Sequence, residues 1–154
     1  YFDVQLMNRG IDISDGRTGL FMTETDILRF ADPNFNTIKE SETVADAISL
    51  MSKIDQSELI VVNQSGEFVG KTNSLSLFNK QGPLSSVDVI DKDCVFIKHD
   101  ASVQSAMEIA SDFVGEIIPI VQTDQNKAVA IITEGAIFQA YLSKQSQTVE
   151  MEKR

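Results

Sequence analysis

The feature that most limits the fold of this chain is an internal repeat. From Glu58 to Phe78 the sequence reads as an apolar strand, a polar turn, a second strand and the start of a helix, and this order recurs from Ile117 to Phe138. Ile38 and Ile97 are 59 positions apart, whereas the two phenylalanines that close these stretches are 60 positions apart. One inserted residue in a turn accounts for the difference, so the register of strands and helices is preserved. The chain is therefore predicted to be a tandem repeat of one small unit.

Composition narrows the functions open to such a repeat. The 154 residues are 42% hydrophobic, enough to bury a core, and no apolar run approaches the length that spans a bilayer, so we expect the fragment to be soluble. Acidic residues outnumber basic ones by 23 to 13, and the net charge of −10 argues against nucleic acid as a partner. The single cysteine, Cys94, excludes an internal disulfide and fits a reducing compartment. Because the chain begins at Tyr1 without a leader, we expect a piece of a longer protein.

Each copy is predicted to contain a strand, a helix, two strands and a helix, which places the chain in the α/β (α+β) class. The first copy comprises strand Asn36–Lys39, a helix capped by Thr43, strands Leu59–Val62 and Phe68–Thr72, and helix Ser74–Asn79. The second comprises strand Val95–Lys98, a helix capped by Ser102, strands Ile117–Val121 and Lys127–Thr133, and helix Glu134–Leu142. A short helix is predicted ahead of each copy, at Thr25–Ala31 and at Leu84–Ile90.

The first helix of each copy carries apolar residues at helical spacing, and these faces are predicted to pack on the sheets. Thr43 and Asp46 stand in capping-box positions at the start of the first of them. The positions predicted to be buried are Val44, Ala47, Ile48 and Met51 in the first copy and Val103, Ala106, Met107 and Ala110 in the second.

Two such units resemble a CBS domain pair, a module named after cystathionine β-synthase. The resemblance rests on Thr43-Val44 and Ser102-Val103 at the helix starts, and on strands that end in Val-Val and Ile-Val. It also rests on the turns into the last helices, Gly70-Lys71-Thr72-Asn73 and Ala130-Ile131-Ile132-Thr133. The resemblance covers about Thr25 to Leu142. It implies two copies packed through their sheets as a pseudo-two-fold module, with two clefts between them.

The stretch before the first copy narrows the resemblance. Phe2 to Asp12, followed by Gly16-Arg17, is similar to the segment after the last membrane helix of CLC (voltage-gated type) chloride channels and transporters. This resemblance implies a homodimeric regulatory domain on the cytoplasmic side of a membrane, attached to the chloride transport domain of the same chain. It divides the sequence into an N-terminal helix and connector (1–24), a first CBS repeat (25–80), a second CBS repeat (84–143) and a flexible tail (144–154).

Adenine nucleotides are the ligands that the CBS resemblance implies for the clefts. The predicted lining is Thr37, Ile38, Ser57, Leu59, Ile60, Thr133 and Glu134 in the first cleft, and Val95, Phe96, Ile118, Pro119, Asn73 and Ser76 in the second. Family members that bind nucleotides read Gly-x-x-Thr-x-x-Asp at the turn into the last helix, where the Asp meets the ribose. Ser76 and Ala136 stand at the Asp positions here. ATP, ADP or AMP is thus expected as an optional regulatory ligand, with no cofactor required.

Simpler structural roles are available for the same residues. Thr133 is more simply a helix cap, and Gly70 a position of close packing between strand and helix. Cys94 is expected to be a small buried hydrophobe, and His99 a solvated turn residue. No zinc motif, nucleophile elbow or Walker sequence is present, so neither enzyme activity nor a metal site is expected. Two alternatives stay open: a purely structural dimerisation domain, and a CBS pair from another transporter or a free-standing nucleotide sensor.

Overall fold

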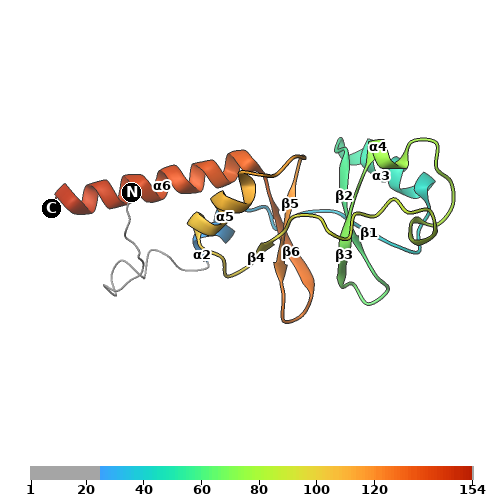
Figure 1. Ribbon diagram of the computed structural model, residues 1–154, viewed down its shortest axis with the longest axis horizontal. Coiled ribbons are helices and arrows are strands. Elements are labelled where there is room, and N and C mark those ends of the chain that lie inside the picture. The colour runs from blue at the N-terminus through green and yellow to red at the C-terminus, as the bar shows by residue number, and fades with distance from the viewer. Residues whose placement is uncertain (1–24, 154) are drawn as a thin grey trace.

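The structure, a computed structural model, describes residues 25–153 and consists of two three-stranded sheets with helices on their outer sides (Figure 1). The helix and connector predicted in 1–24 lie outside these residues. The first repeat contains β1 (Thr37–Lys39), α3 (Val44–Ile54), β2 (Glu58–Val62), β3 (Phe68–Asn73) and α4 (Ser74–Leu77). The second contains β4 (Ile97–Lys98), α5 (Val103–Ala110), β5 (Ile118–Gln122), β6 (Lys127–Ile132) and α6 (Glu134–Lys153). Helix α2 (Thr25–Leu28) precedes the first repeat, and the 3₁₀ helix η1 (Leu84–Ser86) lies between the two.

The two sheets have the same topology, as the sequence repeat predicts. In the first sheet β1 pairs in parallel with β2, and β2 pairs in antiparallel with β3; β4, β5 and β6 pair in the same way. A bulge interrupts each antiparallel pair at equivalent positions, between Val61 and Val62 and between Ile120 and Val121. The mixed α+β class and the tandem arrangement are therefore confirmed.

Polar side chains start the helices that follow the first strands, as predicted. Thr43 Oγ1 accepts a hydrogen bond from the Asp46 main chain at 3.2 Å, and the Asp46 carboxylate accepts from the Thr43 main chain at 3.2 Å. These two bonds complete the capping box of α3. At the start of α5, Ser102 Oγ accepts from the Ser105 main chain at 3.1 Å.

The apolar faces of these two helices pack on the sheets, with one exception. The buried members are Val44, Ala47 and Met51 of α3 and Val103, Ala106 and Ala110 of α5, and Met107 is half-buried. Ile48, which was predicted to be buried, keeps 48% of its surface exposed. It follows Ala47 directly, about 100° further around the helix axis, and so falls outside the narrow buried stripe.

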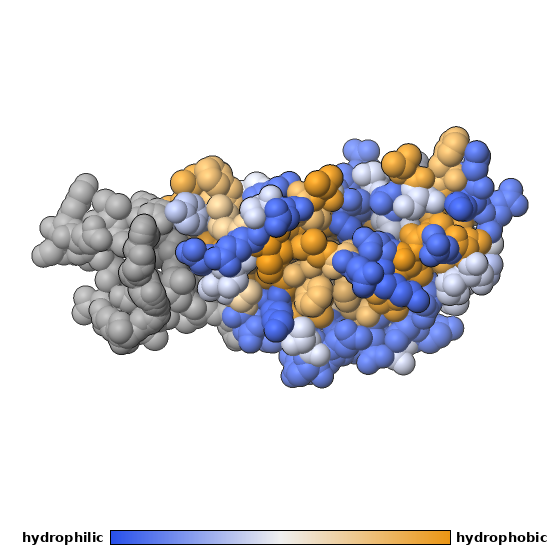
Figure 2. Space-filling view, viewed as in Figure 1, coloured by the Kyte–Doolittle hydropathy of each residue, from blue (hydrophilic) through white to orange (hydrophobic). Residues whose placement is uncertain are grey.

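Some large apolar side chains remain on the surface of α4. Leu75 and Phe78 are 85% and 70% exposed, and Figure 2 shows apolar surface over this helix. Phe138 on α6, the residue equivalent to Phe78, is 51% exposed. Apolar residues therefore sit at equivalent surface positions in both repeats.

Two helices have boundaries that differ from the prediction. The helix expected at Leu84–Ile90 is a single 3₁₀ turn, because Asp88 has a left-handed backbone with φ of 56° that a helix does not accommodate. At the other end of the chain, α6 continues to Lys153 instead of ending at Leu142, so the segment assigned to a flexible tail extends a helix. The residues after Leu142 include no Gly or Pro, and nothing in their sequence terminates a helix.

The two sheets contact each other through an apolar cluster and one buried ion pair. The cluster joins Ile60 and Val62 of the first repeat to Ile117 and Ile131 of the second. Beside it, Lys71 of β3 pairs with Glu58 of β2; the Nζ to Oε1 distance is 2.8 Å, and the two side chains are 8% and 10% exposed.

This ion pair ties the repeats together because its hydrogen bonds cross between them. Lys71 Nζ also donates to the Ile117 carbonyl at 2.7 Å and lies 4.8 Å from the centre of the Phe113 ring. Glu58 Oε1 accepts from the main-chain N–H groups of Glu116 and Ile117, both at 2.9 Å. Both charges therefore have several partners, which is the condition for burying them.

The segments that lead into the repeats are exchanged between them. Ile27 of α2 packs in the hydrophobic cluster of the second repeat, whereas Leu84 and Val89, from the segment before the second repeat, pack in the cluster of the first. In Figure 1 α2 accordingly lies beside α5 and α6. The hydrophobic cores thus cross the boundaries drawn at 25–80 and 84–143.

Gly70 permits one of these crossings. A Cβ at this position would overlap the carbonyl oxygen of Asp91, whose main chain pairs with that of Lys71. The close packing expected at this glycine is therefore real, but its partner is the main chain ahead of the second repeat and not a helix.

Replacing Lys71 with Met is expected to lower the free energy of unfolding by about 3 to 5 kcal/mol, because Glu58 would stay buried without a counter-charge. Adding Glu58→Gln should restore part of this loss, since the amide is neutral and its oxygen can still accept from Glu116 and Ile117. Urea unfolding of the variants measures both effects, with the exposed Lys98→Met as the control expected to change little. A double variant no more stable than Lys71→Met would contradict this account.

Candidate functional site

Only part of the first predicted cleft is exposed. Its exposed members are Thr37, Ser57, Thr133 and Glu134. Ile38 and Leu59 lie in the hydrophobic cluster of the first repeat, and Ile60 lies in the cluster between the sheets. The side chains of these three residues therefore belong to the core, and the four exposed residues are those available to a ligand.

The second predicted cleft offers less exposed surface. Phe96 and Ser76 are exposed, Val95 and Asn73 are half-buried, and Ile118 and Pro119 are buried. The Phe96 ring packs near that of Phe68, with the ring centres 6.2 Å apart. Asn73 Oδ1 accepts from the Ser76 main chain at 2.8 Å, so the Asn73 side chain serves as the cap of α4.

Thr133 occupies the equivalent cap position at α6. Its Oγ1 accepts from the Ala136 main chain at 3.1 Å, and its carbonyl accepts from the Ile137 main chain at 3.1 Å. The role as a helix cap is therefore confirmed. A hydroxyl that accepts one hydrogen bond can still donate its own proton, so the cap leaves Thr133 able to contact a ligand.

The N-termini of α4 and α6 differ in what they leave free. At α4 the Ser74 N–H donates to the Ser57 carbonyl at 2.9 Å, and the helix is four residues long. At α6 the N–H groups of Glu134 and Gly135 have no acceptor among the described residues. The space beside Gly135 is open, since a Cβ added to this glycine would have Thr133 Oγ1 as its nearest neighbour, 3.9 Å away. The start of α6 is thus the better anion site of the two.

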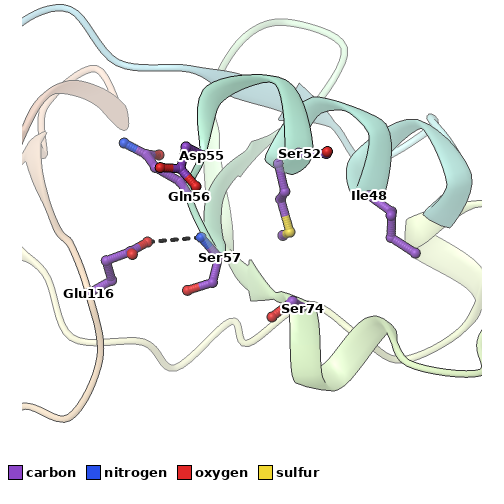
Figure 3. Close-up of a pocket in the computed structure, with 8 residues that line it drawn as sticks. Ile48, Ser52, Asp55, Gln56, Ser57, Ser74 and Glu116 are labelled. Atoms are coloured by element: carbon purple, nitrogen blue, oxygen red, sulfur yellow. Dashed lines mark hydrogen bonds between the residues drawn. The ribbon is translucent and has the colours of Figure 1, made fainter.

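An open hollow of about 430 Å³ lies between the end of α3, the start of α4 and the loop before β5 (Figure 3). Its lining residues are Ile48, Met51, Ser52, Asp55, Gln56, Ser57, Ser74 and Glu116. Glu116 Oε1 accepts from the Ser57 N–H at 3.1 Å and links the two repeats across the hollow. Asp55 and Glu116 contribute carboxylates and no lining residue is basic, so the hollow disfavours a phosphate.

His99 and Cys94 differ from expectation. His99, which was expected to be solvated, is half-buried, and the Nδ1 of its ring has no partner among the described residues. Its main-chain N–H donates to the Val121 carbonyl at 3.0 Å and extends the pairing of β4 with β5. Cys94 is half-buried, and burial raises the pKa of its thiol to about 11. The thiol therefore stays protonated near neutral pH and is a poor nucleophile.

Sequence reasoning did not identify the residues that join the repeats here. Glu58, Lys71 and Glu116 carry no local signal, since their partners are distant in sequence. The open end of α6 did have a local signal: Gly135 lies two residues after the cap Thr133, and glycine exposes its main chain. Across the part of the chain that the structure describes, no group of three His, Cys, Asp or Glu side chains could hold a metal ion, and no helix is long and apolar enough to cross a membrane.

Comparison with known proteins identifies the repeats. The family model of the CBS domain matches residues 26–70 and 86–143. No curated protein sequence matches the chain. The second range contains the second sheet with α5 and the first part of α6, whereas the first range ends at Gly70, within β3, and does not include α4.

Solved structures share the fold. The CBS-pair protein CBSX2 from Arabidopsis thaliana has a TM-score of 0.64 and 17% identity, and the match covers 78% of this chain and 96% of that one; CBSX2 has also been solved in complex with AMP. The CBS pair of a putative Mg²⁺ transporter from Shewanella oneidensis has a TM-score of 0.67 and 17% identity over 76% of this chain and 70% of that one. The cytosolic domain of the Mg²⁺ channel MgtE in complex with ATP has a TM-score of 0.62 and 16% identity over 71% of this chain and 46% of that one.

At these identities the structural likeness establishes the fold alone. The family model, by contrast, covers both repeats and more than half of the sequence. Together with the two equivalent sheets and their equivalent bulges, this match shows that the chain belongs to the CBS domain family and carries its domain in tandem.

Proposed function

We propose that the chain is a regulatory CBS pair that binds an adenine nucleotide in the first cleft, at the start of α6. The observation that carries the proposal is the open helix end, where the N–H groups of Glu134 and Gly135 adjoin the Thr133 hydroxyl. Free N–H groups at a helix N-terminus bind phosphate. The complexes of CBSX2 with AMP and of MgtE with ATP support this class of ligand.

The charge around the site favours a ligand of low charge. Glu134 places a carboxylate at the same helix end, where it competes with phosphate, and the whole chain carries a net charge of −10. Ala136 stands where an aspartate would accept from the ribose and offers no side-chain acceptor. Binding is therefore expected to be weak, with AMP preferred over ATP.

The parent protein is proposed from the N-terminal sequence. The similarity of Phe2 to Asp12 to the segment after the last membrane helix of CLC proteins supports a cytoplasmic CBS pair of a CLC chloride channel or chloride/proton antiporter. These residues lie outside the described part of the chain. The two Mg²⁺ transport proteins among the structural neighbours favour a divalent-cation transporter as the second candidate.

A homodimer is proposed from the exposed apolar side chains. Leu75, Phe78 and Phe138 place apolar area on the surface of both repeats, and removing such area from water stabilises association. A second copy of the chain presents the same residues, so a two-fold interface can cover them in both partners at once. This dimer is also the function that would remain if no nucleotide binds.

The nucleotide proposal predicts a thermal shift. AMP at about 100 times its dissociation constant should add about 2.7 kcal/mol to the free energy of unfolding and raise Tm by about 5 to 10 °C. Thr133→Val should abolish the shift, because it removes the hydroxyl. Differential scanning fluorimetry with AMP, ADP, ATP and S-adenosylmethionine at matched ionic strength provides the measurement.

The matched control is Ser76→Ala, at the exposed ribose position of the second cleft. It should leave the shift intact. If Ser76→Ala removes the shift and Thr133→Val does not, the ligand occupies the second cleft; if millimolar AMP, ADP, ATP and S-adenosylmethionine all leave Tm unchanged, the nucleotide proposal is wrong.

The dimer proposal predicts that Phe78→Asp separates the subunits, because a charge at the centre of an apolar interface must be desolvated. Light scattering after size exclusion should show the molar mass fall from two chains to one. Val114→Asp is the control, since Val114 is 95% exposed but lies on the loop after α5. A wild-type chain that is monomeric at tens of micromolar would refute the dimer.

The CLC proposal predicts that the full-length protein, reconstituted in liposomes, carries chloride, and that AMP changes the rate of chloride efflux. Thr133→Val should leave efflux without AMP unchanged and remove the response to AMP. If the liposomes release Mg²⁺ and not chloride, the CLC proposal is wrong, and the parent protein is a divalent-cation transporter.

A further inference from the structure

Two phenylalanine rings meet at the second predicted cleft. Phe96 belongs to that cleft and directly precedes β4, whereas Phe68 is the first residue of β3 in the other repeat. Their ring centres are 6.2 Å apart and their planes are inclined by 60°, within the range of favourable aromatic contacts. Phe68 is half-buried against the cluster between the sheets, and Phe96 is 38% exposed. The ring pair therefore bridges the two repeats at this cleft.

The first predicted cleft has short side chains at the equivalent positions. With the offsets of 59 and 60, Thr37 corresponds to Phe96 and Ala128 corresponds to Phe68. The two sheets have the same topology and equivalent bulges, so the side chains of both pairs start from equivalent main-chain positions. A hydroxyethyl group and a methyl group are too short to meet across a gap that two phenyl rings span. Thr37 and Ala128 therefore leave the first cleft unbridged at this place.

One further pair of positions reverses in size, but it does not cancel this contrast. Phe35, two residues before Thr37, packs on the cluster between the sheets, and its equivalent in the second repeat is the smaller Cys94. The three equivalent positions thus carry Phe, Thr and Ala at the first cleft, and Cys, Phe and Phe at the second. The second cleft still holds the larger side-chain volume, and its two rings are in contact.

The turn between β5 and β6 holds Phe68 in this place. The Phe68 N–H donates to the Asn126 carbonyl at 2.7 Å, and Asn126 Nδ2 donates to the Phe68 carbonyl at 3.3 Å. Asn126 and its equivalent Gly66 both have a left-handed backbone, with φ of 53° and 84°. Gly66 has no side chain to bond in the same way, and a Cβ added to it would have no neighbour within 4 Å. One turn therefore ties the repeats together at Phe68, whereas the equivalent turn is open.

We propose that Phe68 and Phe96 block the second cleft, so that each chain binds a single nucleotide, in the first cleft. The block itself is independent of the proposed function, whereas the single nucleotide rests on it. An adenine base binds by burying its flat ring among apolar side chains, and here two side-chain rings already fill that place. The helix end agrees with the block, because the Ser74 N–H at the start of α4 is bonded to the Ser57 carbonyl.

Removing the two rings should open the second cleft. Phe68→Ala combined with Phe96→Thr gives it the residues found at the first cleft. Equilibrium dialysis of the whole chain against adenosine counts the bound ligand, and adenosine is used because it needs no phosphate contact. The double variant should bind one adenosine more per chain than wild type, whether or not the first cleft binds any. A folded double variant that binds no more adenosine than wild type would overturn the proposal.

The reciprocal exchange tests the same rings at the first cleft. Thr37→Phe combined with Ala128→Phe should remove the rise in Tm that AMP causes, because the rings would then occupy the place of the base. Gln125→Phe is the control, since it adds a ring on the exposed turn before β6 and should leave the rise intact. A rise that survives the exchange would contradict the block; if AMP does not raise the Tm of wild type, the nucleotide proposal is wrong and the adenosine count alone decides on the block.

Folding of each variant is checked by circular dichroism. If Phe68→Ala prevents folding, Phe96→Thr alone replaces the double variant, since that side chain is 38% exposed, and the same gain of one adenosine is expected. Wild type supplies the last test without any substitution. Two AMP molecules bound to each wild-type chain would show that the second cleft is open, and the proposal would fail.

Discussion

A buried ammonium group at the junction of the two repeats has to find acceptors on both of them. Lys71 Nζ meets the Glu58 carboxylate on its own repeat and the Ile117 carbonyl on the other, with the Phe113 ring beside it. A shift of one repeat against the other by a single residue would remove the carbonyl and leave a poorly compensated charge, which is costly in a dry interior. Apolar contacts between the sheets tolerate such shifts far better, so we assign the register of the junction to the ion pair.

The same pair breaks the symmetry of the module. With offsets of 59 and 60, the positions equivalent to Glu58 and Lys71 are Ile117 and Ile131, which are apolar and belong to the cluster between the sheets. One side of the pseudo-two-fold junction is therefore polar and the other is apolar. The helix ends differ as well, because α4 is short and its Ser74 N–H is already bonded, whereas the first N–H groups of α6 have no acceptor within residues 25–153. Two copies of one unit thus present two different candidate sites.

Local sequence patterns were sufficient for the parts of this fold that local interactions determine. The repeat offset located the strands, and Thr43 and Ser102 located the helix starts, because caps bond to residues three positions away. Local sequence patterns did not predict contacts between residues that are far apart in the sequence, nor the backbone conformation of a single residue. The bond from Lys71 to Ile117 spans 46 residues, and the packing of Ile27 on the second repeat follows from no local spacing. The left-handed backbone at Asp88 stopped a helix that apolar spacing alone would continue.

The predicted site residues show the same division. Thr133 was predicted as a helix cap, which its bond from the Ala136 main chain confirms, because a cap follows from position in the sequence. Its contact with a ligand stays a prediction. Ile38, Leu59 and Ile60 were assigned to a cleft from their place in the repeat, yet their side chains fill the cores, since a strand buried on both faces leaves no side chain for a ligand. Such a strand contributes to a site by placing the residues that follow its end, as β6 places Thr133 and the start of α6. In β6 that position is set on one side by β5 and on the other by Asp32, so the geometry of the candidate site depends on a segment that the repeat pattern alone would place in the other copy.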